Sequence, residues 1–272
     1  MSDSILALPP PPIDLRIRYG DHAVQFVDVR LPKNADKPPV AIVVHGGFWR
    51  EQYTLDHIGH LCAALTSCGI ATWSIEYRRL GQTHDWTELF FDVAAAADAV
   101  RNHAQQFNFD LNRVMTIGHS AGGHLALWLA GRHNIPRSSP LWQKHPLMLC
   151  GAISLAGVVD LERAYELRLS QRVVAELLGG SPAEFPERYH ATSPAALLPL
   201  GVRQIVVHGT NDGPVPFALS EHYVKQAQQA GDDIELIALH GAHHFELIDP
   251  TTHEWHAVQH AACHLLGIEA RP

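Results

Sequence analysis

The chain has 272 residues, of which 46% are hydrophobic and 18% are charged, and its formal net charge is -8. This length and composition predict one large folded domain with a sizeable core, and they exclude general disorder. No run of Lys or Arg supplies the clustered positive charge on which phosphate-backbone binding depends, so no nucleic-acid partner is expected.

Residues 1–13 form a proline-rich leader with consecutive prolines at positions 9–12. The leader has neither the positive region nor the apolar core of a secretory signal. No apolar stretch approaches the roughly 20 residues that span a bilayer. The cysteines lie scattered among apolar residues without metal-site spacing, as is typical of a reducing compartment: Cys62, Cys68, Cys150 and Cys263. We therefore expect a soluble, cytoplasmic protein with no membrane partner.

After the leader, short apolar runs alternate with helical patterns. The amphipathic runs at residues 14–19 and 24–31 predict an antiparallel pair of edge strands. Further strands are predicted at residues 40–44, 70–76, 113–117, 149–155, 203–208 and 234–239, and helices at residues 54–67, 87–107, 121–132, 161–178, 216–230 and 251–266. This alternation predicts an α/β fold over residues 1–272, with a mostly parallel sheet of about eight strands and helices on both faces.

One connection is longer than the others. Roughly forty residues separate the strand near Leu155 from the strand near Arg203, which is too long for an ordinary connection. The predicted helix at residues 161–178 lies within it and ends at Gly179-Gly180. Because open parallel sheets hold ligands at the carboxyl ends of their strands, we expect about residues 159–200 to form a small lid there. The alternative is an excursion with a purely structural role.

The pentapeptide Gly118-His119-Ser120-Ala121-Gly122 stands between a predicted strand and a predicted helix. Strand, G-x-S-x-G and helix in that order are typical of a nucleophile elbow, in which a strained turn projects a serine above the sheet. The glycines are needed because a side chain two residues from the serine would collide across the tight turn. Ser120 is therefore the candidate nucleophile.

A serine nucleophile needs a base and an acid that orients the base. Downstream strands end in loops that carry Asp212 and then His244, which gives the order serine, acid, histidine. His243 competes with its neighbour, since spacing does not separate them. Asp212 has the alternative role of a turn cap beside glycine. Two other carboxylates are weaker candidates for the acid, Asp160 because the lid helix follows it at once and Asp249 because it lies close to the histidine in sequence.

The strand at residues 40–44 runs into His45-Gly46-Gly47-Phe48-Trp49. Glycines there let the backbone approach a ligand closely, so the backbone N–H groups of Gly46, Gly47 and Phe48, with that of Ala121, are the candidate oxyanion hole. The alternative is a plain Gly-Gly turn. Phe48 and Trp49 are expected to give the substrate an apolar wall.

These motifs resemble those of α/β-hydrolases of the esterase and kynurenine formamidase (arylformamidase) group. That group carries H-G-G-aromatic-W after the third strand, G-H-S-A-G-x-H-L at the elbow, and a histidine followed by Phe near the C-terminus, which match residues 45–49, residues 118–125 and His244-Phe245. The resemblance implies the α/β-hydrolase fold, selects His244 over His243, and implies no cofactor or metal. Hormone-sensitive-lipase-like esterases differ, with glycine where Phe48 stands and aspartate where His119 stands.

The expected function is therefore hydrolysis of a small carboxylic ester through an acyl-enzyme on Ser120. Hydrolysis of the amide in N-formylkynurenine is the alternative, and a hydrolase-fold protein that only binds a ligand is a remoter one. A metal site is not expected, because the C-terminal helix lacks H-E-x-x-H spacing. Its histidines share one stripe opposite the apolar face, which predicts exposure to solvent: His253, His256, His260 and His264.

Overall fold

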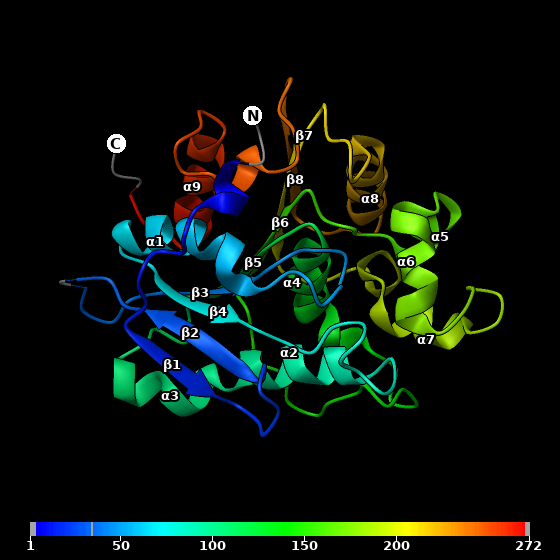
Figure 1. Cartoon of the computed structure of the whole chain (residues 1–272), viewed down its shortest axis with the longest axis horizontal. Helices are drawn as coiled ribbons and strands as arrows, with labels where there is room; N and C mark the ends of the chain where they lie inside the picture. The colour runs from blue at the N-terminus through cyan, green and yellow to red at the C-terminus, as the bar shows by residue number, and fades with distance from the viewer. Residues whose placement is uncertain (1–3, 34, 270–272) are drawn as a thin grey trace.

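The computed structural model describes residues 4–33 and 35–269. A single eight-stranded sheet runs through it in the order β1-β2-β4-β3-β5-β6-β7-β8 (Figure 1). The strands are β1 Leu15–Arg18, β2 Phe26–Arg30, β3 Val40–Val44, β4 Ala71–Ile75, β5 Val114–His119, β6 Gly151–Leu155, β7 Arg203–Gly209 and β8 Ile234–Leu239. The β1–β2 and β2–β4 pairings are antiparallel, and β3 to β8 run parallel. The predicted strand series and fold class are confirmed.

The helices are α1 Gly59–Ser67, α2 Glu88–Asp98, α3 Val100–Phe107, α4 Ala121–Gly131, α5 Leu161–Glu166, α6 Leu169–Leu178, α7 Pro186–Thr192, α8 Phe217–Gln229 and α9 Trp255–Leu265. Short 3-10 helices lie at η1 Ser4–Ala7, η2 Leu55–Ile58, η3 Arg132–Asn134, η4 Pro194–Leu197 and η5 Glu246–Ile248.

The two faces of the sheet bury separate cores, because successive side chains of a strand point to opposite faces. Along β3, Ala41 and Val43 pack with α1 and α9, whereas Ile42 packs with α2, α4 and α8. Every residue of β3, β4, β5 and β6 is buried, which is why these strands read as continuous apolar runs. The helices therefore cover both faces, as predicted.

The long connection after β6 differs from its prediction in detail. The single helix expected at residues 161–178 is two helices. The backbone is interrupted by positive φ at Arg168, which lies between α5 and α6, and at residues 170–172 in the first turn of α6. Helix α7 was not predicted, although Pro186 occupies a favoured first helical position.

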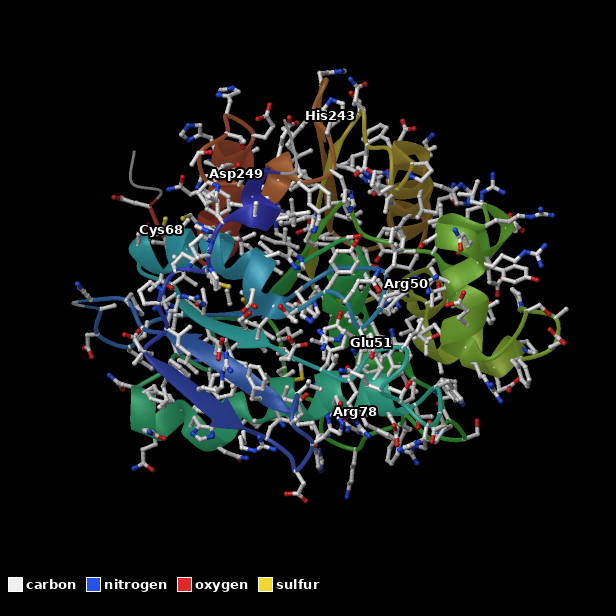
Figure 2. All side chains as sticks on the ribbon, in the orientation of Figure 1. Arg50, Glu51, Cys68, Arg78, His243 and Asp249 are labelled. Atoms are coloured by element: carbon white, nitrogen blue, oxygen red, sulfur yellow. The ribbon has the colours of Figure 1, made fainter. Side chains whose placement is uncertain are left out.

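This connection packs against the body of the domain. Trp128 of α4 donates its indole N–H to the carbonyl of Ala191, at 3.0 Å. Arg50, in the loop after β3 and labelled in Figure 2, donates to a carboxylate oxygen of Glu176 in α6, at 2.9 Å. Helices α5 to α7 therefore lie together beside α4 (Figure 1). A lid function for residues 159–200 stays a prediction.

Candidate active site

The turn between β5 and α4 holds Ser120 in a strained conformation, with φ 56° and ψ -121°. A methyl group at Gly118 would lie 2.0 Å from the carbonyl oxygen of Gly122, and one at Gly122 would lie 2.0 Å from that of Val44. The backbone N–H of Ser120 donates to the carbonyl of Leu155 at 2.8 Å, which ties the turn to β6. Glycine is thus required on both sides of the serine, and the strain falls on the serine itself.

His244 and Asp212 are hydrogen bonded, although they lie in separate loops after β8 and β7. Nδ1 of His244 is 2.6 Å from Oδ2 of Asp212, and the other carboxylate oxygen accepts the backbone N–H of Val215 at 2.8 Å. Because Asp212 is an acceptor, the proton lies on Nδ1, and Nε2 of the neutral ring is free to accept one. The side chains of His244 and Asp212 are 5% and 0% exposed.

A second histidine, His208 at the end of β7, also contacts this carboxylate. Its Nε2 lies 3.2 Å from Oδ2 of Asp212 and 3.0 Å from the carbonyl oxygen of Val215, while its Nδ1 lies 2.7 Å from the hydroxyl of Ser220. Burial alone would raise the pKa of Asp212, but hydrogen bonds from His208 and His244 lower it well below its ordinary value. Asp212 is therefore a carboxylate at neutral pH. His208 was missed by the sequence analysis, although its position beside Asp212 at a strand end was a usable signal.

His119 connects the serine turn to His244. Its Nε2 is 2.9 Å from the carbonyl oxygen of His244, and the two rings are 4.4 Å apart. Within the described residues, Ser120 and His244 share no hydrogen bond. In enzymes without a ligand such bonds are often long and tighten only when substrate is present.

The rival residues have other partners. His243 is exposed at the rim (Figure 2), and its Nδ1 lies 3.1 Å from the carbonyl oxygen of Asn211. Asp160 caps α5 by accepting the backbone N–H of Arg163, at 3.0 Å. Asp249 accepts the backbone N–H of Thr251, at 2.9 Å. The geometry therefore brings together Asp212 and His244.

The loop after β3 lies directly against Ser120. A methyl group at Gly46 would be 2.9 Å from Cβ of Ser120 and 2.6 Å from the carbonyl oxygen of His119. Gly47 has φ 107°, a conformation that suits glycine. In the described part of the chain, the backbone N–H groups of residues 46–48 make no hydrogen bond. That of Ala121, at the start of α4, has no acceptor within the helix. Unpaired backbone N–H donors therefore lie on two sides of Ser120, in the loop after β3 and at the start of α4.

Of the two residues expected to form an apolar wall, Trp49 is not on the surface, and for Phe48 this role stays a prediction. Phe48 is partly exposed, whereas Trp49 is fully buried and packs its ring edge-on to His124, with 5.3 Å between centroids. Both have positive φ, 51° and 57°, and this backbone turns the indole into the core. Trp49 therefore supports the loop from beneath and does not line an open surface. Tyr53, 37% exposed and packed on Gly47, is an aromatic side chain that the sequence analysis missed.

The four histidines of the predicted stripe are exposed, although His253 lies just before α9. Trp255, Val258 and Ala262 are on the buried face of this helix. Among residues 4–33 and 35–269, no three His, Cys, Asp or Glu side chains are grouped so that they could hold a metal ion. In the same ranges, no helix has the length and apolar character needed to cross a membrane.

Two curated relatives carry esterase names. Esterase LipC of Mycobacterium tuberculosis (strain ATCC 25618 / H37Rv) is 28% identical over 255 residues, covering 88% of this chain and 62% of that protein. The probable isoprenylcysteine alpha-carbonyl methylesterase ICMEL1 of Arabidopsis thaliana is 26% identical over 255 residues, covering 87% of this chain and 52% of that protein. The chain thus spans only about half to three fifths of these relatives' lengths.

Solved structures share the fold. A truncated carbohydrate esterase from gut microbiota superposes with a TM-score of 0.81 at 20% identity, covering 96% of this chain and all of that one. The propionate-bound esterase 2 of Thermogutta terrifontis superposes with a TM-score of 0.75 at 24% identity, covering 94% of each chain. The relatives named here are esterases, so membership of the kynurenine formamidase-like group stays a prediction. The model of the BD-FAE family matches residues 27–226, and the chain belongs to this α/β-hydrolase esterase family.

Proposed function

We propose that the protein is a serine carboxylesterase that hydrolyses small esters through Ser120, His244 and Asp212. The observation that carries this proposal is the 2.6 Å hydrogen bond between Nδ1 of His244 and the buried carboxylate of Asp212, on loops that meet beside the serine turn. The strained φ of Ser120 and the family of the chain support it. The esterase names of the curated relatives support it independently.

In the first half of the reaction, the Ser120 oxygen forms a bond to the ester carbonyl carbon while Nε2 of His244 takes the hydroxyl proton. Asp212 holds the imidazole in the required tautomer and stabilises its charged form. The tetrahedral intermediate then expels the alkoxide, which receives the proton from His244. Water repeats the sequence on the acyl-enzyme, releasing the acid and restoring Ser120.

The negative charge of the tetrahedral intermediate falls on the former carbonyl oxygen. The backbone N–H groups of Gly46, Gly47 and Phe48 are its proposed donors from one side, and that of Ala121 is the donor from the other. Their lack of partners supports this assignment, since a donor already paired within the protein is less available to the oxyanion. The ring of Phe48 is the proposed apolar contact of the substrate.

The formyl amide of N-formylkynurenine is the second candidate substrate. The H-G-G-F-W segment at residues 45–49 and the elbow at residues 118–122 favour it, because the formamidase group shares both motifs. The same residues would serve, with an aniline nitrogen in place of the alkoxide as leaving group.

A direct comparison of kcat/KM for p-nitrophenyl acetate and N-formylkynurenine separates the two. We expect ester turnover that disappears in Ser120→Ala and persists in Ser67→Ala, which changes an exposed serine at the end of α1. Equal turnover in wild type and Ser120→Ala would contradict the proposal. Much faster hydrolysis of the formyl amide would move the physiological activity to formamidase.

A further inference from the structure

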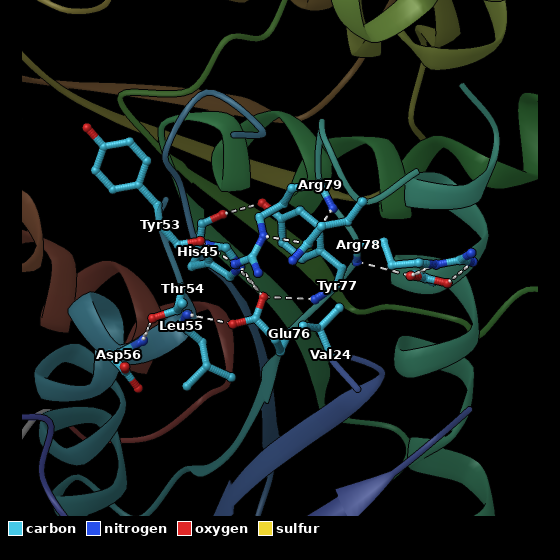
Figure 3. Close-up of polar contacts among 12 residues, drawn as sticks. Val24, His45, Tyr53, Thr54, Leu55, Asp56, Glu76, Tyr77, Arg78 and Arg79 are labelled. Atoms are coloured by element: carbon cyan, nitrogen blue, oxygen red, sulfur yellow. Dashed lines mark hydrogen bonds and ion pairs between the residues drawn. The ribbon is translucent and has the colours of Figure 1, made fainter. Parts of the chain in front are cut away.

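The loop that carries Gly46 and Gly47 is held by a cluster of buried polar side chains (Figure 3). His45 is fully buried directly after β3, and Glu76 and Arg79, which follow β4, are each 2% exposed. Charged groups are rarely buried in this way unless they are paired and hydrogen bonded. The mechanism proposed above uses none of these side chains, so their presence beside the loop needs a separate reason.

Glu76 is the centre of the cluster. Its Oε1 lies 3.0 Å from Nε2 of His45 and 2.8 Å from Nη1 of Arg79, and it accepts the backbone N–H of Tyr77 at 3.1 Å. Its Oε2 accepts the backbone N–H of Leu55 at 3.0 Å. Burial by itself would raise the pKa of Glu76, but His45, Arg79 and these hydrogen bonds lower it overall. Glu76 is therefore a carboxylate, and each of its oxygens can only accept hydrogen bonds.

Two further contacts fix the direction of consecutive peptide groups. The hydroxyl of Tyr77 donates to the carbonyl of His45 at 2.9 Å, and Nδ1 of His45 lies 2.9 Å from the carbonyl oxygen of Gly46. In a trans peptide the C=O and the following N–H point in opposite directions. Holding the carbonyl of His45 therefore orients the N–H of Gly46, and holding the carbonyl of Gly46 orients the N–H of Gly47. Glycines otherwise permit many backbone orientations, so these contacts select one.

The hydrogen bonds also show what each ring nitrogen of His45 faces. Nδ1 faces a carbonyl oxygen and Nε2 faces a carboxylate oxygen, and neither oxygen can donate. Each ring nitrogen therefore faces an acceptor, and Nδ1 meets the Gly46 carbonyl as a donor. The ring stacks on Tyr77, with centroids 4.4 Å apart and planes at 20°, which fixes its position.

The other end of the loop is bound to the same cluster. Arg79 donates to the carbonyl of Tyr53, whose Cβ covers Gly47 so closely that a methyl group there would lie 2.4 Å away. The N–H of Leu80 donates to the carbonyl of Trp49, at 2.8 Å. Both sides of the turn at Gly46 and Gly47 are thus tied to the segment that follows β4.

We infer that His45 is a positioning residue for the oxyanion hole: Glu76 holds its ring, and Nδ1 donates to the Gly46 carbonyl and thereby directs the Gly47 N–H toward the reacting oxygen. Glu76 holds the His45 ring, and Arg79 holds the far side of the loop through the carbonyl of Tyr53. The inference rests on the proposed function, because it concerns the same reaction.

Two amide variants of His45 separate the two ring nitrogens. In His45→Asn the side-chain amide lies at the same distance from the backbone as Nδ1 and can still donate to the Gly46 carbonyl. In His45→Gln the amide reaches the position of Nε2, so it keeps the Glu76 contact and leaves the Gly46 carbonyl without its donor. If His45 only stabilised the fold, both variants would be less stable than wild type, and their kcat values would not differ from each other.

With p-nitrophenyl acetate, we expect His45→Gln to lose about 100-fold in kcat, as for loss of one oxyanion donor, while KM changes little. His45→Asn should stay within about tenfold of wild type. Thermal unfolding of each variant confirms folding, and Tyr77→Phe, which frees the His45 carbonyl, should lower kcat in the same direction. If His45→Asn falls as far as His45→Gln with both folded, or if neither falls, the inference is overturned.

Crystal structures of the two amide variants test the inference even if the wild type proves to hydrolyse no ester. The Gly46 carbonyl should keep its direction in His45→Asn and rotate away in His45→Gln. An unchanged carbonyl in both variants would refute the positioning role. Absence of Ser120-dependent turnover in the wild type would instead refute the proposed function.

Discussion

Replacing Asp212 by asparagine tests the acid of the proposed triad. In the structure one carboxylate oxygen accepts from His244 at 2.6 Å and faces His208 at 3.2 Å, while the other accepts the backbone N–H of Val215 at 2.8 Å. An amide has only one acceptor oxygen. In either orientation, Asp212→Asn therefore places an NH2 group against at least one N–H donor and removes the negative charge.

The size of the effect depends on what His244 loses. If the amide nitrogen faces the two imidazoles, His244 must move its proton to Nε2 and cannot act as a base. If the amide oxygen faces them, the tautomer survives without the charge that stabilises the imidazolium. Loss of the correct tautomer in a Ser-His-Asp site costs about 10⁴-fold in kcat, which is about 5 kcal/mol of activation free energy. We expect a loss of about 10³- to 10⁴-fold.

Asp160→Asn is the matched control, because Asp160 is a rival carboxylate after β6 whose side chain caps α5. Asparagine is nearly as good a helix cap as aspartate, so that variant should fold and keep kcat within about threefold. Initial rates with p-nitrophenyl acetate, together with thermal unfolding, measure both variants. Turnover within about tenfold of wild type in folded Asp212→Asn, or an equal loss in Asp160→Asn, would refute the assigned acid.

Gly46→Ala should reduce kcat by tenfold or more, and should cost about 1–3 kcal/mol of stability, because its methyl group would lie 2.6 Å from a backbone carbonyl oxygen. Steady-state kinetics and urea unfolding measure these, and a fully active, equally stable variant would contradict the close approach. Burial lowers the pKa of His57 to about 3 and that of His124 to about 4. An unfolded histidine has a pKa of about 6.5, so between these values the unfolded chain binds more protons. Stability is then complete above about pH 6.5 and falls by about 1.4 kcal/mol per pH unit for each ring as the pH decreases. Urea unfolding between pH 7 and 5 measures how the free energy of unfolding changes with pH. In His124→Phe this slope should be smaller by the contribution of one ring, and an identical slope in both proteins would contradict the burial argument.

The strands of the sheet were predictable because their burial is nearly uniform along the chain. Residues 40–44 are all buried, so an apolar run without alternation indicated a central parallel strand. The elbow was predictable for a local steric reason, since the methyl groups excluded at Gly118 and Gly122 would meet backbone oxygens within a few residues or on the adjoining strand. Local rules of this kind are readable in a single sequence.

The parts that sequence analysis missed depend on contacts between distant segments. Nothing local distinguishes Trp49 from an exposed aromatic residue, and its burial follows from the positive φ of the loop and from the packing of His124. The break between α5 and α6 falls at residues without glycine or proline, at Arg168 and residues 170–172. The pairing of Glu76 with His45 joins segments 31 residues apart. Such features become visible only when the chain is folded.

Trapping of the acyl-enzyme tests whether Ser120 is the nucleophile. Wild-type protein mixed with p-nitrophenyl acetate is quenched in acid within milliseconds, digested and mapped by mass spectrometry. We expect one acetyl group on Ser120 that appears with the burst of p-nitrophenol. Two results would contradict this assignment. One is steady hydrolysis without acetylated Ser120, and the other is acetylation of a different residue that accounts for all of the turnover.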